Sequence, residues 1–278
     1  MTSPATNGDT RYLARPGGRI GYDVTGEGPL VVCIPGMGDL RGSFRFLVPA
    51  LAAAGYRVAT MDLRGHGDSD ATFETYDDVA AGSDALALIA ELGGPAVIVG
   101  NSMGAGAAAW AAAETPDAVA GVVLVGPFVR NPPSSAVATL LFRLLLLKPW
   151  GPAALLGWYD KLMPGERPAD HAAYKAALKA NLAKPGHWAG FQRTSHTSHA
   201  PVEARLGYVR TPVLVVMGDR DPDFKDPAAE ARWIADRLGG SVVMVPGTGH
   251  YPQAQAPAVV NAAVLAFLAE ALPVAPRA

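Results

Sequence analysis

Disulfide bonds are the first feature that this sequence lacks, because Cys33 is the single cysteine among 278 residues. It lies in the apolar run 30–34, where we expect a small core residue. A reactive thiol would need an electropositive and partly exposed setting. Charge is also scarce, since charged residues make up 17% of the chain and the formal net charge is −2. The charge balance therefore gives no indication of nucleic acid or an acidic membrane as a partner.

Long apolar runs are missing as well. The most apolar stretch, 137–147, is interrupted by Arg143 and closed by Lys148 and Pro149, so it is too short and too broken to span a bilayer. Residues 1–11 are polar and contain no apolar segment of the kind found in signal peptides, which predicts a cytoplasmic protein. Half of the residues are hydrophobic, as is typical of a globular protein with a large core. The sequence leaves the oligomeric state open.

Short Val-rich runs alternate with helical patterns along most of the chain. The runs lack polar alternation, as central strands covered on both faces do, and they lie at 30–34, 57–61, 96–99, 119–125, 213–217 and 242–245. An antiparallel hairpin is predicted at the start, with strands at 12–14 and 19–24. Helices are predicted at 43–54, 76–91, 103–114, 227–238 and 254–271. This order predicts an α/β fold, with a mainly parallel sheet flanked by helices.

The segment 128–208 interrupts this order, because its pattern is helical, broken by prolines, and free of Val-rich strands. It predicts a helical cap inserted between two late strands, above the strand ends where open α/β sheets bind ligands. The predicted domains are a core of residues 1–127 and 209–278 and a cap of residues 128–208. Within the cap, the apolar stretch from Leu140 to Trp158 is expected to pack mostly on the core. Any part of it that faced the site would favour an acyl or aromatic ester.

Ser102 is the strongest candidate for a catalytic nucleophile. It stands in Gly100-Asn101-Ser102-Met103-Gly104, a G-x-S-x-G motif that follows a predicted strand and precedes a predicted helix, as a nucleophile elbow requires. A serine at the tip of such a turn has a strained backbone, and the two glycines avoid collisions because they lack Cβ. The N–H of Met103 begins the helix, so we expect it to donate to a developing oxyanion.

A serine hydroxyl needs an adjacent base, and His250 is the predicted one. Among the six histidines, it is the one on a glycine-rich loop that follows the last predicted strand. Four others fall in the predicted cap and are expected at the surface or in supporting positions: His171, His187, His196 and His199. Of these four, His196 and His199 are candidates for lining the pocket.

The base in turn needs a carboxylate that fixes its tautomer and stabilises its cation. The loop after the strand 213–217 carries several, and Asp221 is the predicted acid. Asp219 follows the strand too closely and is expected to brace the turn. Asp223 and Asp226 lie further along the loop, where Asp226 is expected to cap the helix that begins at Pro227.

Taken together, these motifs resemble the α/β-hydrolase superfamily over nearly the whole chain, and Ser102, Asp221 and His250 occur in the nucleophile–acid–base order of that fold. In relatives, a turn that often reads His-Gly-X supplies a second oxyanion donor. The resemblance implies that the N–H of Met37, in the turn 35–39, has this role, although Pro35 replaces the histidine. Residues 62–69 are similar to the family's D-x-R-G-x-G-x-S segment, so we expect His66 to brace the loop beside the site.

These residues predict a serine hydrolase that acts by acyl transfer on a small, largely apolar ester or a related carbonyl compound. The reaction needs no metal and no cofactor. The sequence contains neither the metal-binding spacing H-E-x-x-H nor a phosphate-binding loop.

Other interpretations remain open. The elbow Asn101-Ser102-Met103-Gly104 resembles that of carbon–carbon bond hydrolases, and other relatives are cofactor-free perhydrolases with the same triad. The first group usually has a longer Gly/Ser-rich oxyanion turn, which residues 35–39 do not match. Haloalkane dehalogenases and epoxide hydrolases place an aspartate at the elbow, so Ser102 counts against both. A ligand-binding receptor on the same fold is the alternative of a different class, and it would bind a ligand tightly without turnover.

Overall fold

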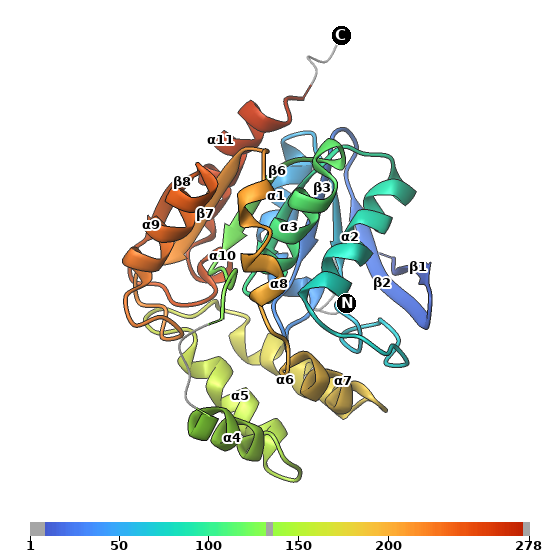
Figure 1. The fold of residues 1–278 in the computed structure, drawn as a ribbon, viewed down its shortest axis with the longest axis vertical. Helices are drawn as coiled ribbons and strands as arrows, with labels where there is room; N and C mark the ends of the chain where they lie inside the picture. The colour runs from blue at the N-terminus through green and yellow to red at the C-terminus, as the bar shows by residue number, and fades with distance from the viewer. Residues whose placement is uncertain (1–8, 132–135, 275–278) are drawn as a thin grey trace.

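A twisted sheet of eight strands forms the centre of the structure (Figure 1). The computed structural model describes residues 9–131 and 136–274. Most of the N-terminal segment, from which we predicted the absence of a signal peptide, lies outside these ranges. The strand order is β1-β2-β4-β3-β5-β6-β7-β8. Their bounds are β1 (Arg11–Arg15), β2 (Gly18–Thr25), β3 (Leu30–Ile34), β4 (Arg57–Met61), β5 (Ala96–Asn101), β6 (Val119–Val125), β7 (Val213–Gly218) and β8 (Ser241–Val245).

Strand direction agrees with the sequence prediction. β1 pairs antiparallel with β2, and β2 pairs antiparallel with β4, whereas the five pairings from β4 to β8 are parallel. Helices flank the sheet, so the predicted α/β fold with a mainly parallel sheet is confirmed.

Two helical layers cover the sheet because its strands are apolar on both faces. In β3, Leu30, Val32 and Ile34 point to one face, and Val31 and Cys33 point to the other. The first face is covered by α2 (Asp78–Leu92), α3 (Met103–Glu114) and α9 (Pro227–Leu238), and the second by α1 (Leu47–Ala53) and α11 (Pro257–Ala271). Cys33 is fully buried, as predicted.

Two of the predicted helices are each divided in the structure. The range 43–54 contains the end of a short 3-10 turn, η1 (Arg41–Phe44), followed by α1. The range 254–271 contains part of α10 (Pro252–Gln255) and the whole of α11. Pro257 starts α11 because its ring fits the first turn of a helix but cannot continue the preceding one. A second 3-10 turn precedes β6 and is η2 (Pro116–Ala118).

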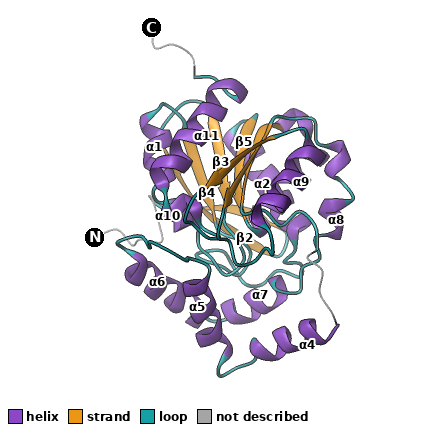
Figure 2. Ribbon diagram, turned by 90° about the vertical axis from the view of Figure 1, so that its left-hand side faces the viewer, coloured by secondary structure: helices purple, strands orange, loops and turns teal. Residues whose placement is uncertain are grey.

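Several helices lie between β6 and β7, as the sequence predicts. They are α4 (Ala136–Leu145), α5 (Gly151–Lys161), α6 (His171–Ala183), α7 (His187–Thr194) and α8 (Ala200–Glu203), followed by the turn η3 (Leu206–Tyr208). Figures 1 and 2 show α4 to α7 as a layer below the sheet. By contrast, α8 and η3 pack beside α3, and Val202 and Leu206 belong to the main core. The separate layer therefore consists of α4 to α7.

The apolar stretch of α4 and α5 differs from expectation. Leu146 and Leu156 are buried, but most other large apolar side chains of this stretch are 42–61% exposed: Leu140, Leu141, Phe142, Leu144, Leu145, Leu147, Trp150 and Trp158. The prediction that the stretch packs mostly on the core is therefore wrong. The reason is its place in the fold, since α4 and α5 form the outer part of the helical layer below the sheet in Figure 1. Among the described helices, none has the length and hydropathy needed to span a membrane.

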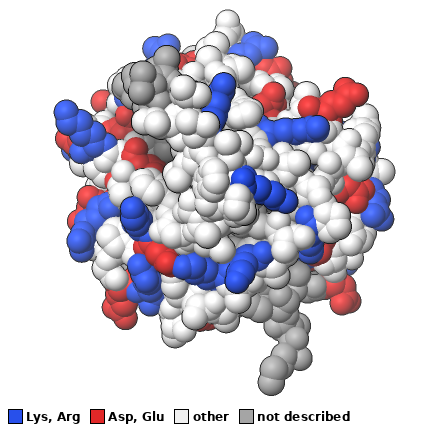
Figure 3. Space-filling view, turned by 90° about the horizontal axis from the view of Figure 1, so that it is seen from below, with Lys and Arg blue, Asp and Glu red and all other residues white. Residues whose placement is uncertain are grey.

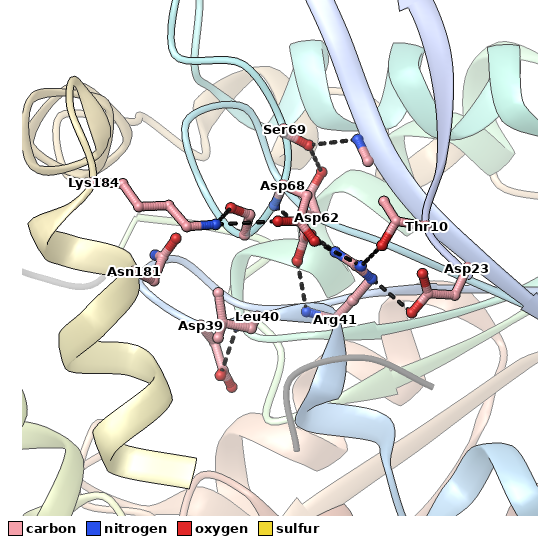
Figure 4. A network of polar contacts seen from close by, with 12 residues as sticks. Thr10, Asp23, Asp39, Leu40, Arg41, Asp62, Asp68, Ser69, Asn181 and Lys184 are labelled. Atoms are coloured by element: carbon pink, nitrogen blue, oxygen red, sulfur yellow. Dashed lines mark hydrogen bonds and ion pairs between the residues drawn. The ribbon is translucent and has the colours of Figure 1, made fainter. Parts of the chain in front are cut away.

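A buried ionic network around Arg41 holds η1 in place (Figure 4). The guanidinium of Arg41 binds carboxylate oxygens of Asp62, Asp23 (2.8 Å) and Asp68 (2.8 Å), and it also donates to the hydroxyl of Thr10 (2.6 Å). Its side chain is 1% exposed, and those of Asp23 and Asp62 are equally buried. Because each charge has partners, the network holds η1 against the end of β4 without leaving a buried charge unpaired.

We expect Arg41→Met to lower the free energy of unfolding by about 3–5 kcal/mol, because the carboxylates of Asp62 and Asp23 would remain buried without their cation. Urea unfolding followed by circular dichroism measures the change. Arg19→Met is the matched control, since Arg19 binds Asp70 at the surface and its loss should change stability little. Equal stability of Arg41→Met and the wild type would contradict this account of the network.

Candidate active site

Ser102 occupies a strained turn between β5 and α3. Its backbone angles are φ 57° and ψ −122°, and it is the one non-glycine residue with positive φ in the described part of the chain. Such a conformation costs about 1–3 kcal/mol and is found mostly at functional sites. A Cβ at Gly100 would lie 2.2 Å from the carbonyl oxygen of Gly104, and one at Gly104 would lie 2.2 Å from that of Ile34. The turn therefore requires both glycines of the motif.

Backbone hydrogen bonds attach the elbow to the end of β6. The N–H of Ser102 donates to the carbonyl of Val125 (2.8 Å), and the N–H of Phe128 donates to the carbonyl of Ser102 (3.3 Å). The side-chain amide of Asn101 donates to the carbonyls of Val125 (3.0 Å) and His250 (3.2 Å). Asn101 thus connects the serine's turn to the loop of the candidate base. Sequence reasoning missed this role, although the position of Asn101 at the end of a central strand could have indicated it.

The structure brings His250 and Asp221 together. Nδ1 of His250 lies 2.7 Å from Oδ2 of Asp221, and both side chains are nearly buried. The ring also lies against the start of the β6 loop, because a Cβ at Gly126 would be 3.1 Å from Nδ1. Gly126 directly follows Val125, which binds the N–H of Ser102. His250 and Ser102 are therefore neighbours across the ends of β5 and β6.

The hydroxyl of Ser102 makes no hydrogen bond to the ring of His250 or to any other group in the described ranges. Catalytic hydrogen bonds are often long in ligand-free structures and tighten when substrate binds. Ser102 is 8% exposed, so little of its side chain is in contact with solvent.

Charge around His250 favours its protonated form. Burial lowers the pKa of this imidazole, but the charge and hydrogen bond of Asp221, together with the charge of Asp223, outweigh burial and raise the pKa to about 9. Oδ2 of Asp223 lies 3.7 Å from Nδ1 of His250, which is closer than the sequence interpretation placed it. The loop turns back because the N–H of Asp223 donates to Oδ1 of Asp221 (3.0 Å). Burial in turn raises the pKa of Asp223.

The two other acids of this loop have the positions that the sequence predicts. Oδ1 of Asp219 accepts the N–H of Gly247 (2.7 Å), so Asp219 braces the turn against the loop of His250. Asp226 caps α9 by accepting the N–H of Ala229 (2.9 Å). Within the described ranges, neither carboxylate binds His250.

The turn 35–39 approaches Ser102 closely enough to contribute to an oxyanion hole. A Cβ at Gly36 would lie 2.9 Å from Cβ of Ser102. The N–H of Asp39 closes the turn on the carbonyl of Gly36 (3.2 Å), and the N–H of Gly38 donates to Nε2 of His66 (3.0 Å). Among the described contacts of this turn, the N–H of Met37 has no partner. It is available for a ligand, as is the N–H of Met103 at the start of α3.

His66 holds this turn as a neutral side chain. Since its Nε2 accepts the N–H of Gly38, its proton resides on Nδ1, which donates to the carbonyl of Arg64 (2.9 Å). Burial lowers the pKa of His66 to about 4. This geometry agrees with the expected structural role of the segment 62–69.

Aromatic rings pack beside the side chain of His250. The ring of Phe128 lies 5.9 Å from that of His250, 5.6 Å from that of His199 and 4.9 Å from that of Phe224. From α6, the hydroxyl of Tyr174 donates to Oδ1 of Asp39 (2.6 Å) in the turn 35–39. Sequence reasoning missed these partners, because they depend on how distant segments pack together.

Three of the histidines between β6 and β7 have hydrogen-bond partners other than Ser102. His171 binds Asp160, and His187 binds Asn181. Nδ1 of His199 lies 2.7 Å from Oδ2 of Asp78 at the start of α2. Its stacking on Phe128, whose ring also contacts that of His250, places His199 near the site.

One cluster of the described residues has the composition of a metal site. Ligand atoms of Asp221, Asp223 and His250 lie within 4.8 Å of one another. However, Nδ1 of His250 and Oδ2 of Asp221 already bind each other, and Oδ1 of Asp221 accepts a backbone N–H. This arrangement fits a histidine–carboxylate pair better than a set of free ligands.

Comparison with known proteins gives consistent similarities. A sequence model described as "Alpha/beta hydrolase family" matches residues 31–263. The chain is 30% identical over 261 residues to a putative non-heme bromoperoxidase of Mycobacterium tuberculosis, covering 90% of this chain and 97% of that protein. It is 29% identical over 229 residues to a pimeloyl-[acyl-carrier protein] methyl ester esterase of Neisseria meningitidis, covering 80% and 86%. The enol-lactonase structure from Burkholderia xenovorans aligns with a TM-score of 0.80 at 23% identity, covering 94% and 100%, which supports the fold.

Proposed function

The chain belongs to the alpha/beta hydrolase family, and we propose that it is a serine hydrolase in which Ser102, His250 and Asp221 perform acyl transfer. The observation that carries the proposal is the strained Ser102 beside a buried His250–Asp221 pair on the adjoining strand ends. Strain at a serine and a paired, buried imidazole are both expected of a nucleophile and its base.

The mechanism follows from these positions. Nε2 of His250 removes the proton of the Ser102 hydroxyl while Oγ attacks the carbonyl carbon of an ester. The oxyanion that forms accepts hydrogen bonds from the N–H groups of Met37 and Met103. The protonated His250, stabilised by Asp221, then gives its proton to the departing alcohol. Water attacks the resulting acyl-enzyme with His250 again as base, which releases the acid and restores Ser102.

We propose that α4 to α7 act as the cap that encloses the substrate. Ser102 and His250 are nearly buried, and apolar side chains surround them, including Phe128 and Tyr251, whose rings contact that of His250. Such surroundings favour a small, largely apolar ester over a charged one. The similarity to a methyl ester esterase is in line with this class.

Perhydrolysis is the second candidate, supported by the similarity to a protein named as a bromoperoxidase. In that reaction, hydrogen peroxide would replace water in the attack on the acyl-enzyme and release a peracid. The same triad would perform both reactions. Carbon–carbon bond hydrolysis and a receptor role have no comparable support in the contacts of the site.

A substrate panel tests the proposal. Purified protein is incubated with p-nitrophenyl esters, methyl esters, lactones and a vinylogous diketone, and with acetate plus hydrogen peroxide. We expect the highest kcat/KM for short acyl esters. Tight binding of an ester without turnover would support the receptor alternative, and turnover of the diketone alone would support the carbon–carbon bond hydrolase.

The raised pKa of His250 also predicts a pH profile. Because the base must be neutral to accept a proton, we expect kcat/KM for a soluble ester to rise with pH and to level off above about pH 9. Asp221→Asn removes the charge that raises this pKa, so the remaining activity should level off at a lower pH. A profile that is flat from pH 6 to pH 10 in the wild type would contradict the assignment of His250 as base.

A further inference from the structure

The outer surface of the cap is unusual for a protein surface in water. We call it the cap surface and define it by eight exposed side chains, of which Leu141 (61%), Leu140 (56%) and Trp150 (54%) are the most exposed; the others are Leu144, Leu145, Leu147, Phe142 and Trp158. The apolar face of an amphipathic helix is normally buried, but α4 is exposed from Leu140 to Leu145. Contiguous exposed apolar side chains of this extent mark an interaction site.

Charge on the cap surface is positive. From Leu140 to Lys161 the chain contains Arg143, Lys148 and Lys161 but a single acid, Asp160. That acid is already bound by Lys175 and His171 of α6. Figure 3 views the molecule from this side and shows a broad uncharged area with Lys and Arg side chains spread across and around it. A surface on which apolar side chains are bordered by cations is complementary to a partner with an apolar interior and anionic groups at its boundary with water.

The exposed side chains of Trp150 and Trp158 also suit a partner with an apolar interior and anionic groups at its boundary. Nε1 of Trp150 donates to the carbonyl of Leu144 (3.1 Å), and Nζ of Lys161 lies 5.7 Å from the ring centre of Trp158. Lys161 also lines a shallow hollow beside α5, together with Arg167 and Gly165. Tryptophan is enriched where an apolar region meets water, and basic side chains beside it can reach lipid phosphates.

A second copy of this chain is a poorer occupant. In a symmetric dimer the same patch would face itself, so Arg143 and Lys148 would meet like charges rather than acids. No acidic side chain of the cap surface is available to pair with them in the described ranges. From these observations we infer that the cap surface docks on an anionic lipid surface.

Docking of the cap surface would also affect which esters reach the site, and this step rests on the proposed function. α5 connects the cap surface to the site, because it carries Trp158, and a Cβ at Gly38 of the turn 35–39 would lie 3.5 Å from the side chain of its Leu155. A docked cap would therefore place the covered site next to the lipid, so that small apolar esters dissolved in that lipid reach it directly.

Vesicle sedimentation tests the docking without relying on catalysis. The full-length protein is mixed with vesicles of phosphatidylcholine alone or with added phosphatidylglycerol, and the bound fraction is measured at low and high salt. We expect binding to the mixed vesicles, and at least ~10-fold weaker binding of Leu141→Ser/Leu145→Ser. Arg143→Gln/Lys148→Gln should weaken binding to the mixed vesicles only. Val259→Ser, an exposed apolar residue on α11, is the matched control and should bind as the wild type does.

Each contrary outcome overturns the docking. The wild type could fail to bind the mixed vesicles, or the Leu141→Ser/Leu145→Ser variant could bind them unchanged. A dimer in analytical ultracentrifugation that this variant makes monomeric, without vesicle binding, would assign the cap surface to self-association. Hydrolysis of a soluble short ester, measured on the same samples, separates the two proposals: its absence would refute the proposed function and leave the vesicle result standing.

Discussion

Ser102→Ala is expected to abolish ester hydrolysis, lowering kcat by about 10⁴-fold or more, because no acyl-enzyme can form without Oγ. The fold should be unaffected. Alanine keeps the Cβ that the φ 57° turn already accommodates, and the hydroxyl has no hydrogen-bond partner in the described ranges to lose. The free energy of unfolding is therefore expected to change by less than about 1 kcal/mol. Steady-state kinetics with p-nitrophenyl acetate and urea unfolding provide the two measurements.

A matched control for this variant is Ser83→Ala. Ser83 lies on α2 and accepts a hydrogen bond from Arg15 of β1 (2.8 Å), away from the proposed chemistry. Its loss should reduce stability somewhat and leave kcat within about threefold. Full activity of Ser102→Ala would remove Ser102 from the mechanism.

Asp221→Asn is expected to lower kcat by about 10⁴-fold, because an amide at this position can no longer hold the imidazole in the required tautomer or stabilise its cation. Asp219→Asn should retain activity within about threefold, since Asp219 binds the N–H of Gly247 rather than the imidazole. Both substitutions replace a carboxylate by an amide, at positions two residues apart in one loop. Each therefore serves as the control for the other. Kinetics on the same soluble ester give the comparison.

Asp223 is the competing acid, because its Oδ2 is 3.7 Å from Nδ1 of His250. At that distance a direct hydrogen bond is absent, and we expect Asp223→Asn to cost less than about tenfold in kcat. A larger loss for Asp223→Asn than for Asp221→Asn would transfer the role of acid to Asp223.

The strands and the elbow could be predicted because local patterns determine them. Val-rich runs define central strands wherever helices cover both faces of the sheet, and the turn at Ser102 needs glycine at positions 100 and 104 for steric reasons that are visible in the motif. The roles of Asp219 and Asp226 also followed from their spacing to the neighbouring strand and helix. The catalytic roles of Ser102, Asp221, His250, Met37 and Met103 remain predictions, as do the domain division and the cytoplasmic location.

Contacts that depend on tertiary packing could not be predicted. The side chain of Asn101 reaches His250, 149 residues away in the sequence, and Tyr174 reaches Asp39 from a helix of the cap. The direction of the apolar side chains in α4 and α5 also depends on packing. The composition of α4 and α5 alone suggests a core segment. Their apolar side chains face solvent because these two helices are the outermost of the helical layer formed by α4 to α7.

Covalent labelling is the most direct test of the central claim. The native protein is treated with a fluorophosphonate probe, digested, and analysed by mass spectrometry to locate the modified residue. The account predicts that the probe modifies Ser102 alone, that labelling follows the same rise with pH as hydrolysis, and that His250→Ala prevents it. Labelling at another serine, or none on protein that hydrolyses esters, would contradict Ser102 as the nucleophile.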